Sequence, residues 1–353
     1  MTDLTIFDHI PDGLLDCRAP ELAGILDGPA LIHLPGRHTA PLFVSVLLHG
    51  NEHTGFDAVR AVLKRHGKTG LPRAMSVFIG NVDAAAAGVR SLEGQRDYNR
   101  CWPGTVVETC PERTLLRRVT EEMGRRGPFA SVDIHNNTGL NPHYACLNRL
   151  DRRFFHMALL FSRTVVYFER PLGVQSAAFA PLCPSITIEC GKSGAADGVE
   201  HAAEAIEAYL SLTDFPAHPV LHQDIDLMRT FAIVKLPDGA DLSFDGAEVD
   251  FRLPATVDRF NFSEVTPGQI FASRAPGSQA RFVVEPAGNV RTSQAELDSC
   301  FAYEGDEIHF ARPVIPAMLT CDPAAVQLDC LCYLMFRIGL DGEPLDGSLA
   351  GAG

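Results

Sequence analysis

The chain has 353 residues, of which 46% are hydrophobic and 21% charged, which is the composition of a globular protein with material for two domains. Its 30 Lys and Arg residues against 44 Asp and Glu residues give a formal net charge of −14. A chain this negative repels nucleic acid and anionic membrane, so we expect neither as a partner and expect a small-molecule substrate instead.

The first thirteen residues carry Asp3 and Asp8 and lack the basic start and apolar run of a signal peptide. No apolar stretch reaches the roughly 18 residues of a membrane-spanning helix, so we expect a cytoplasmic protein. The ten cysteines are irregularly spaced and are expected to be free, mostly buried thiols. The oligomeric state stays open, with a homo-oligomer among the options.

Apolar runs of strand length alternate with amphipathic helical patterns from roughly residue 42 to residue 212. The predicted strands are 42–48, 75–79, 130–134, 164–168 and 185–188. The predicted helices are 53–66, 111–126 and 199–212. This alternation predicts an α/β fold, with a sheet flanked by helices.

After Pro216 short strand-like pieces recur between Pro and Gly turn signals, which favours a smaller β-rich domain. These pieces are 231–236, 247–253, 269–273, 281–284 and 307–310. We therefore expect two domains, residues 1–214 and 215–353.

Four motifs, each at the end of a strand or in a polar loop, carry side chains suited to chemistry. They are His49-Gly50-Asn51-Glu52, Arg96-Asp97-Tyr98-Asn99-Arg100-Cys101-Trp102, Asp133-Ile134-His135-Asn136-Asn137-Thr138, and Ile186-Thr187-Ile188-Glu189-Cys190-Gly191. In open α/β sheets, ligands bind at the carboxyl ends of the strands, where we expect these motifs to meet.

Two imidazoles and one carboxylate can hold a zinc ion and leave a fourth position for water. His49, Glu52 and His135 supply such a set, and Gly50 permits a tight turn between the first two. Bound zinc makes water acidic, and a free carboxylate such as Glu189 can take its proton. The four motifs together predict a hydrolase with one zinc per chain.

Each motif alone has a structural explanation. His201 and Glu204 repeat the spacing of His49 and Glu52 inside a predicted helix, where we expect a solvated helix face. His135 alone fits a structural histidine, and Glu189 alone fits a buried acid paired with an arginine. Only the joint pattern favours a zinc site.

The four motifs in this order resemble the succinylglutamate desuccinylase/aspartoacylase family, which belongs to the carboxypeptidase-A-like zinc hydrolases. The similarity covers roughly residues 40–200 and implies a carboxypeptidase-like mixed sheet. By this resemblance His49, Glu52 and His135 match the zinc ligands, and Glu189 matches the general base that activates the zinc-bound water.

The resemblance also implies roles for the polar loop. Asn99 and Arg100 match the pair that grips a substrate carboxylate, and Asp97 matches an acid that orients a zinc-bound histidine. Arg90 resembles the arginine that stabilises the oxyanion, with Arg96 as the alternative. Tyr303 resembles, by a looser alignment, a tyrosine that lines the substrate pocket.

One departure bears on the substrate. Acyl-aspartate hydrolases of this family carry another arginine about ten residues before the catalytic glutamate, but residues 171–188 here contain no Arg or Lys, and Phe179 and Ala180 stand in that neighbourhood. We therefore expect a deacylase that cleaves the amide of a small N-acylated amino acid or related amine with a neutral portion. The alternatives are a metallocarboxypeptidase acting on short peptides, an ester hydrolase and a zinc-binding module without catalysis.

Overall fold

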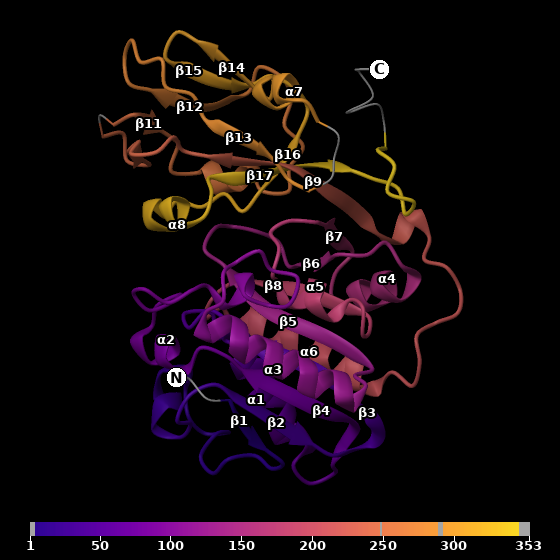
Figure 1. The fold of residues 1–353 in the computed structure, drawn as a ribbon. Helices are drawn as coiled ribbons and strands as arrows, with labels where there is room; N and C mark the ends of the chain where they lie inside the picture. Colours follow the sequence, from indigo (N-terminus) through magenta and orange to yellow (C-terminus); the bar gives the residue numbers. More distant parts are fainter. Residues whose placement is uncertain (1–3, 248, 289–291, 346–353) are drawn as a thin grey trace. The chain divides into compact units, whose positions relative to one another are not determined.

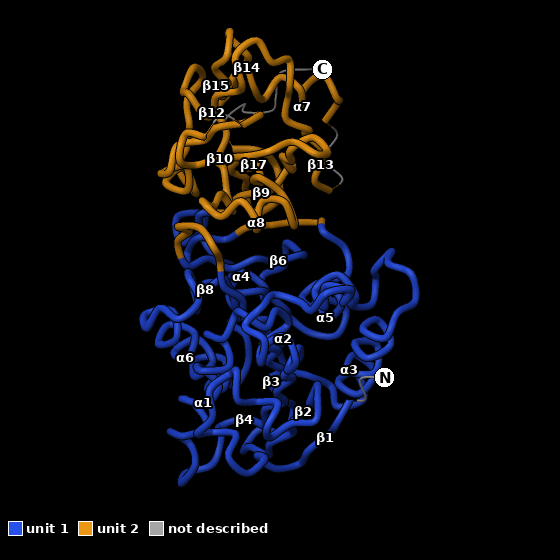
Figure 2. Tube along the Cα trace, turned by 90° about the vertical axis from the view of Figure 1, so that its left-hand side faces the viewer, with its two compact units in different colours: residues 1–136, 143–165, 171–226 blue, residues 137–142, 166–170, 227–353 orange. Residues whose placement is uncertain are grey.

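A computed structural model describes residues 4–247, 249–288 and 292–345 of the chain (Figure 1). It contains two compact units, drawn in two colours in Figure 2. The first comprises residues 1–136, 143–165 and 171–226, and the second comprises residues 137–142, 166–170 and 227–353. The domain boundary expected at 214–215 stays a prediction.

The elements before residue 226 alternate between strands and helices. The strands are β1 (Thr5–Phe7), β2 (Ala30–Leu34), β3 (Gly36–Val46), β4 (Leu71–Ile79), β5 (Ala130–Asn137), β6 (Tyr144–Leu147), β7 (Thr164–Tyr167) and β8 (Ser185–Lys192). The α-helices are α1 (Thr54–His66), α2 (Val82–Ala87), α3 (Pro111–Arg126), α4 (Arg152–Leu159), α5 (Gln175–Phe179) and α6 (Ala196–Ser211). Three short 3-10 helices cover Ala19–Gly24, Tyr98–Arg100 and His222–Asp224.

The sheet of the first unit is mixed, with strand order β1-β2-β4-β3-β5-β8-β6. β3 pairs in parallel with both β4 and β5, whereas β2 runs antiparallel to β4 and β6 antiparallel to β8. The expected α/β fold with a mixed sheet is therefore confirmed.

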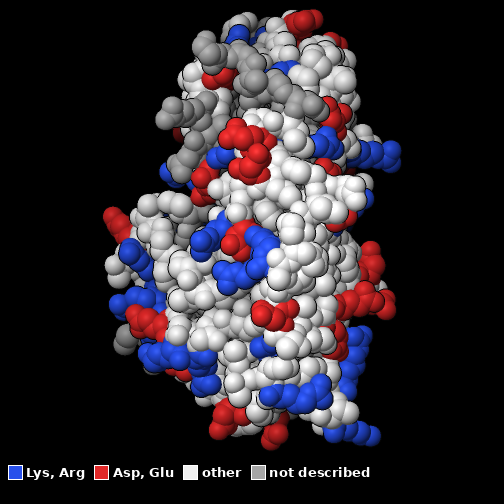
Figure 3. All heavy atoms as spheres, turned by 90° about the vertical axis from the view of Figure 1, so that its right-hand side faces the viewer, with Lys and Arg blue, Asp and Glu red and all other residues white. Residues whose placement is uncertain are grey.

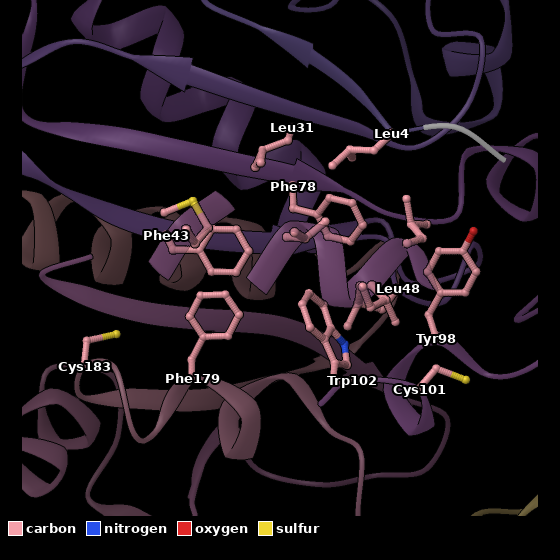
Figure 4. Close-up of a cluster of buried hydrophobic side chains, with 14 residues drawn as sticks. Leu4, Leu31, Phe43, Leu48, Phe78, Tyr98, Cys101, Trp102, Phe179 and Cys183 are labelled. Carbon is pink, nitrogen blue, oxygen red and sulfur yellow. The ribbon is translucent and has the colours of Figure 1, made fainter. Parts of the chain in front are cut away.

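Helices cover both faces of this sheet, which explains why the second half of β3, residues 41–46, is buried and apolar except for Ser45 (Figure 1). On one face α1 packs on α6, and α6 in turn contacts β4 and β8. On the other face lies a cluster of buried side chains from α3, β2, β3 and β4. In Figure 4, Phe43, Phe179 and Trp102 of this cluster face one another. Phe179 stacks on Phe43 at 4.5 Å between ring centroids and meets Trp102 edge-on at 5.9 Å.

The predicted elements match the observed ones most closely where capping signals are clear. The predicted helix 111–126 has the bounds of α3, which begins with Pro111 at its first turn and is followed by Gly127 with φ of 61°. β5 and β8 extend three or more residues beyond their predicted ends. The expectation that His135 and its neighbours follow a strand is wrong, because the strand continues through Asn137.

The second unit is rich in β-structure, as expected. Its strands are β9 (Asp226–Lys235), β10 (Leu242–Ser243), β11 (Phe251–Arg252), β12 (Ile270–Arg274), β13 (Val283–Pro286), β14 (Phe301–Glu304), β15 (Glu307–Phe310), β16 (Ile315–Ala317) and β17 (Cys332–Arg337). Its helices are α7 (Gln294–Asp298), α8 (Pro323–Leu328) and the 3-10 turn Val257–Phe260.

Two groups of strands organise the second unit. β9 pairs antiparallel with β13 and β17, and β17 pairs antiparallel with β16. A separate five-stranded sheet has the order β10-β11-β12-β15-β14 and encloses stacked phenylalanines. Phe271 lies 4.7 Å from Phe310 and 5.5 Å from Phe301, so aromatic packing forms this small core.

The surface carries charges of both signs. On the face drawn in Figure 3, Lys and Arg side chains lie interspersed with Asp and Glu rather than forming one continuous field. Among the described residues, none of the helices has the length and apolar character to cross a bilayer.

Candidate active site

The chain turns sharply where β3 ends, and this turn brings His49 and Glu52 together. Leu47 adopts a left-handed conformation with φ of 55°, which costs a non-glycine residue about 1 kcal/mol and is common at functional sites. The Glu52 N–H then donates to the His49 carbonyl at 3.1 Å, which closes a four-residue turn. Gly50 sits inside this turn, where a Cβ atom would lie 2.2 Å from the backbone of Ala84.

His49, Glu52 and His135 converge on one point. Each offers one ligand atom, and these atoms lie within 4.8 Å of one another. The Nδ1 atoms of His49 and His135 lie 2.8 Å from Glu52 Oε1 and Oε2, respectively. All three residues are buried. Within the part of the chain that the structure describes, no other group of three His, Cys, Asp or Glu residues meets this criterion.

The second nitrogen of each imidazole faces a carboxylate. His49 Nε2 lies 3.1 Å from Asp97 Oδ1, and the orienting role that the family resemblance implies for Asp97 stays a prediction. His135 Nε2 lies 2.7 Å from Asp133 Oδ2, a contact that we did not predict. Asp133 and His135 are two apart in β5, so their side chains share one face of the strand, and that spacing was the available signal. Such carboxylates fix the tautomer and orientation of metal-binding histidines.

The electrostatics of the cluster suit a divalent cation. Burial disfavours a charged Glu52, yet His49 and His135 hold the pKa of that carboxyl well below its usual value. Burial also disfavours a charged His135, yet Asp133 and Glu52 raise the pKa of this imidazole well above its usual value. Three carboxylates thus surround two imidazoles, and the two Nδ1 atoms with a Glu52 oxygen form the His-Glu-His donor set of zinc hydrolases. The residues present fit zinc.

Glu189 carries a further carboxylate on β8, beside β6, where it pairs with Tyr144. Burial raises the pKa of Glu189 to about 8, Glu52 and Asp133 add to the shift, and His135 and Arg90 oppose it. These four neighbours place Glu189 in the electrostatic environment of the cluster. A carboxyl group with a pKa near neutrality can both accept and return a proton.

Arg90 lies beside the cluster. Its guanidinium donates to Glu52 Oε1 at 3.3 Å and to Asp97 Oδ2 at 3.0 Å, with about a third of the side chain exposed. Arg96, the alternative for the oxyanion role, has an exposed side chain. Arg90 thus contacts Glu52, a predicted zinc ligand, and this contact favours Arg90 over Arg96 for the oxyanion role.

Asn99 and Arg100 lie in the 3-10 turn that follows Asp97. The Asn99 side chain is buried, with Nδ2 3.1 Å from His135 Nε2 and 3.3 Å from Asp133 Oδ2, while its Oδ1 accepts from the Gln175 N–H at 2.9 Å. Arg100 donates to the Asn99 carbonyl at 3.0 Å. Asn99 therefore donates to Asp133, the acid beside His135, and the substrate-carboxylate role of this pair stays a prediction.

Two other residues lie in settings that the sequence did not predict. Tyr303 belongs to β14 of the second unit, where its hydroxyl accepts from the Phe282 N–H at 3.0 Å, and its substrate role stays a prediction. His201 was expected on a solvated helix face, which is wrong. It is half-buried in α6, and its Nδ1 lies 2.7 Å from Nδ1 of His143.

Comparison with known proteins assigns the first part of the chain. Residues 40–213 match the model of the succinylglutamate desuccinylase/aspartoacylase catalytic domain. This segment belongs to the succinylglutamate desuccinylase/aspartoacylase family. The resemblance inferred from the four motifs is therefore confirmed. No curated protein sequence matches the chain.

Solved structures with similar folds include a desuccinylase, an aminoacylase and an ectoine utilization protein. Succinylglutamate desuccinylase from Chromobacterium violaceum is 20% identical, with a TM-score of 0.52 over 73% of this chain and 87% of that chain. Murine aminoacylase 3 is 19% identical, with a TM-score of 0.57 over 86% of this chain and 96% of that chain. The product-bound ectoine utilization protein from Ruegeria pomeroyi is 14% identical, with a TM-score of 0.57 over 88% of each chain. At these identities the likeness shows the fold alone.

Proposed function

We propose that this protein is a zinc-dependent deacylase that hydrolyses the amide bond of a small N-acylated amino acid or related amine. The observation that carries the proposal is the buried His49–Glu52–His135 cluster beside Glu189 in a chain of a deacylase family. His49, Glu52 and His135 would hold one zinc ion. Zinc, when bound, supplies a Lewis acid that polarises the amide carbonyl and lowers the pKa of water.

The remaining chemistry falls to residues of this chain. Glu189 takes a proton from the attacking water and returns it to the leaving nitrogen. The Arg90 guanidinium stabilises the negative charge that develops on the carbonyl oxygen. Arg100 binds the substrate carboxylate, for which its planar guanidinium is suited. Asp97 and Asp133 keep both histidines in the tautomer that presents Nδ1 to the metal.

The segment before β8 supports a substrate with a neutral portion. The first turn of α5 approaches the cluster through the Gln175 N–H, and its next side chain is neutral. Ser176 is fully buried, donating to Asn148 Oδ1 at 2.8 Å and accepting from Thr187 at 3.2 Å. Phe179 is buried in the core against Phe43. This segment thus offers no cation to a second substrate carboxylate.

Glu189→Gln tests the proposal. We expect the variant to keep its zinc and to lose activity by roughly 10²–10⁴-fold, because the amide cannot accept a proton. Glu204→Gln is the matched control, since Glu204 is exposed on α6 and repeats the histidine–glutamate spacing. Zinc per chain is measured by elemental analysis and turnover by release of free amine from N-acyl amino acids. Full activity of Glu189→Gln would contradict the assigned base.

A substrate panel tests the substrate class separately. N-acetylated neutral amino acids, N-acetylaspartate, dipeptides and simple esters are compared by kcat/KM with zinc-loaded enzyme. We expect the neutral N-acyl amino acids to be the best substrates. Faster hydrolysis of N-acetylaspartate than of the neutral N-acyl amino acids would contradict the expected preference for a substrate with a neutral portion. A preference for dipeptides would make the protein a carboxypeptidase. A zinc-loaded protein that cleaves none of them would contradict the deacylase proposal.

A further inference from the structure

Two cysteines face each other at the two ends of the loop of residues 102–109. Cys101 Sγ lies 3.9 Å from Cys110 Sγ, and both thiols are free. Cys101 is fully buried and belongs to the cluster of Figure 4. Cys110 is half-buried, and Thr109 before it is exposed. The contact therefore joins one protected sulfur to one that a small oxidant can reach.

The two sulfurs differ in their surroundings. Cys110 is the N-cap of α3, where its Sγ accepts from the Arg113 N–H at 3.4 Å. A helix N-terminus stabilises negative charge, and the thiolate is the form of cysteine that reacts with oxidants. Burial raises the pKa of Cys101 to about 12, and the neighbouring Cys110 adds to the shift, so Cys101 keeps its proton at pH 7. Cys110 should therefore react first, with Cys101 as the thiol that follows.

A bond between the sulfurs requires only a local movement. The S–S bond of a disulfide is about 2.05 Å long, so the two atoms must approach each other by roughly 2 Å. Cys101 is fixed by the packed cluster around it, whereas Gly104, Val106 and Glu108 in the intervening loop are exposed. The end that carries Cys110 can therefore move towards Cys101, and its sulfur then gives up the Arg113 N–H.

We propose that Cys101 and Cys110 are a site of reversible oxidation that forms a disulfide when the protein meets a hydroperoxide such as hydrogen peroxide. The Cys110 sulfur attacks one peroxide oxygen, the O–O bond breaks, and Cys110 becomes a sulfenic acid while one water leaves. The Cys101 sulfur then attacks the Cys110 sulfur, and the hydroxyl leaves as a second water with the Cys101 proton. Two thiols are oxidised to one disulfide, and the peroxide is reduced to two waters.

The disulfide would act on the loop that carries Arg100. Cys101 follows Arg100 directly, and the Arg100 carbonyl accepts from Thr105 Oγ1 at 2.6 Å, a residue inside the loop that the disulfide closes. In the proposed function, on which this step rests, Arg100 binds the substrate carboxylate. Since a misplacement of about 1 Å in a positioning group can cost up to 10²-fold, oxidation should raise KM for N-acyl amino acids by at least ~3-fold and change kcat less.

The experiment maps the disulfide in the full-length, zinc-loaded protein after treatment with hydrogen peroxide. The protein is denatured, alkylated with iodoacetamide and digested with trypsin without a reductant. Trypsin cleaves after Arg100 and Arg113, so both cysteines fall in the peptide 101–113. We expect mass spectrometry to show this peptide without alkyl groups and two hydrogens lighter than its reduced form. Dithiothreitol before alkylation should return it to the doubly alkylated form and KM to its starting value.

Two variants control the result. Cys110→Ser should keep the fold, because serine is a favoured N-cap, and should show neither the disulfide nor the rise in KM. Cys321→Ser removes another half-buried cysteine, whose sulfur donates to the Ala255 carbonyl at 3.3 Å, and should oxidise like the wild type.

Three outcomes would count against the proposal. A wild-type peptide 101–113 that stays doubly alkylated, or one that carries sulfinic acid at Cys110, would overturn the disulfide site. A disulfide that forms while KM stays the same would overturn its link to Arg100. The peptide map does not depend on hydrolytic activity, so the disulfide and the proposed deacylase fail separately.

Discussion

At the scale of single residues, Asp133, which the sequence analysis did not assign a role, holds the predicted zinc ligand His135 in position. Asp133 is fully buried and accepts hydrogen bonds from Ser45 Oγ at 2.5 Å and from Asn99 at 3.3 Å, in addition to its contact with His135. Ser45 reaches it because β3 pairs in register with β5 at these two residues. The sheet therefore fixes the carboxylate, and the carboxylate fixes the imidazole.

Asp133→Asn should weaken zinc binding by about 10–100-fold, because the amide removes the charge that holds His135 in its metal-binding tautomer. Zinc affinity is measured by competition with a chromophoric chelator, with His135→Ala as the reference for loss of a ligand. Asp57→Asn is the matched control, since Asp57 contacts His53, which is not in the cluster, at 2.9 Å. Unchanged affinity in a folded Asp133→Asn variant would show that the charge of Asp133 does not hold His135 in its metal-binding tautomer.

At the scale of elements, the sequence predicts the helices and strands whose ends are marked by their own residues. It misses the strands that are defined by pairing with a neighbouring strand. The Pro, Arg and Gly signals around 111–127 predict α3, and the apolar run 42–48 predicts the strand that leads into His49. β1, β2 and β6 were missed because they are short or are defined by their partners in the sheet. β5 continues through polar residues because its neighbours supply the hydrogen bonds that an isolated apolar pattern cannot reveal.

The same distinction between local and long-range contacts explains which side-chain contacts the sequence could predict. His49 and Glu52 are predictable as a pair because they are three positions apart in the sequence with a glycine between them, and the motifs of a known family add His135 and Glu189. His143 and His201 are 58 residues apart, and only the packing of α6 beside β8 brings them together. The sequence therefore contains both histidines but gives no sign that they lie next to each other in the fold.

Gly50→Ala should damage the turn between β3 and α1. The added Cβ would lie 2.2 Å from both the Ala84 carbonyl carbon and the Ala85 nitrogen, which are backbone atoms that cannot move cheaply. We expect the free energy of unfolding to fall by about 1–3 kcal/mol or more, together with weaker zinc binding. Gly124→Ala in α3, with open space around its Cβ, should instead stabilise by about 0.5–1 kcal/mol. Urea unfolding of both variants measures the difference, and equal stabilities would contradict the close approach.

At the scale of the whole molecule, acid stability depends on buried groups as well as on the net charge. His33 is one such group, on β2, where its Nδ1 lies 2.8 Å from Ser76 Oγ and its side chain is about 8% exposed. Burial lowers the pKa of His33 to about 4, the positive charge of Arg126 adds to the shift, and Glu122 opposes it. In the native protein this imidazole therefore stays neutral until the pH is well below that at which an exposed histidine becomes charged.

The sign of the effect on stability follows from proton binding. Between about pH 6.5 and pH 4 the unfolded chain binds a proton at His33 that the native protein does not, so the unfolded state is favoured as the pH falls. The free energy of unfolding should lose up to ~3 kcal/mol from this group over that window and lose no more below pH 4. His33→Gln should remove this slope, and the exposed His9→Gln variant should keep it. Urea unfolding is measured at half-unit pH steps, and the variant curves are subtracted from the wild-type curve. The difference isolates the contribution of His33 from that of all other titrating groups, which the three proteins share apart from His9. Parallel curves for wild type and His33→Gln would mean that the native His33 takes up its proton as readily as an exposed histidine does.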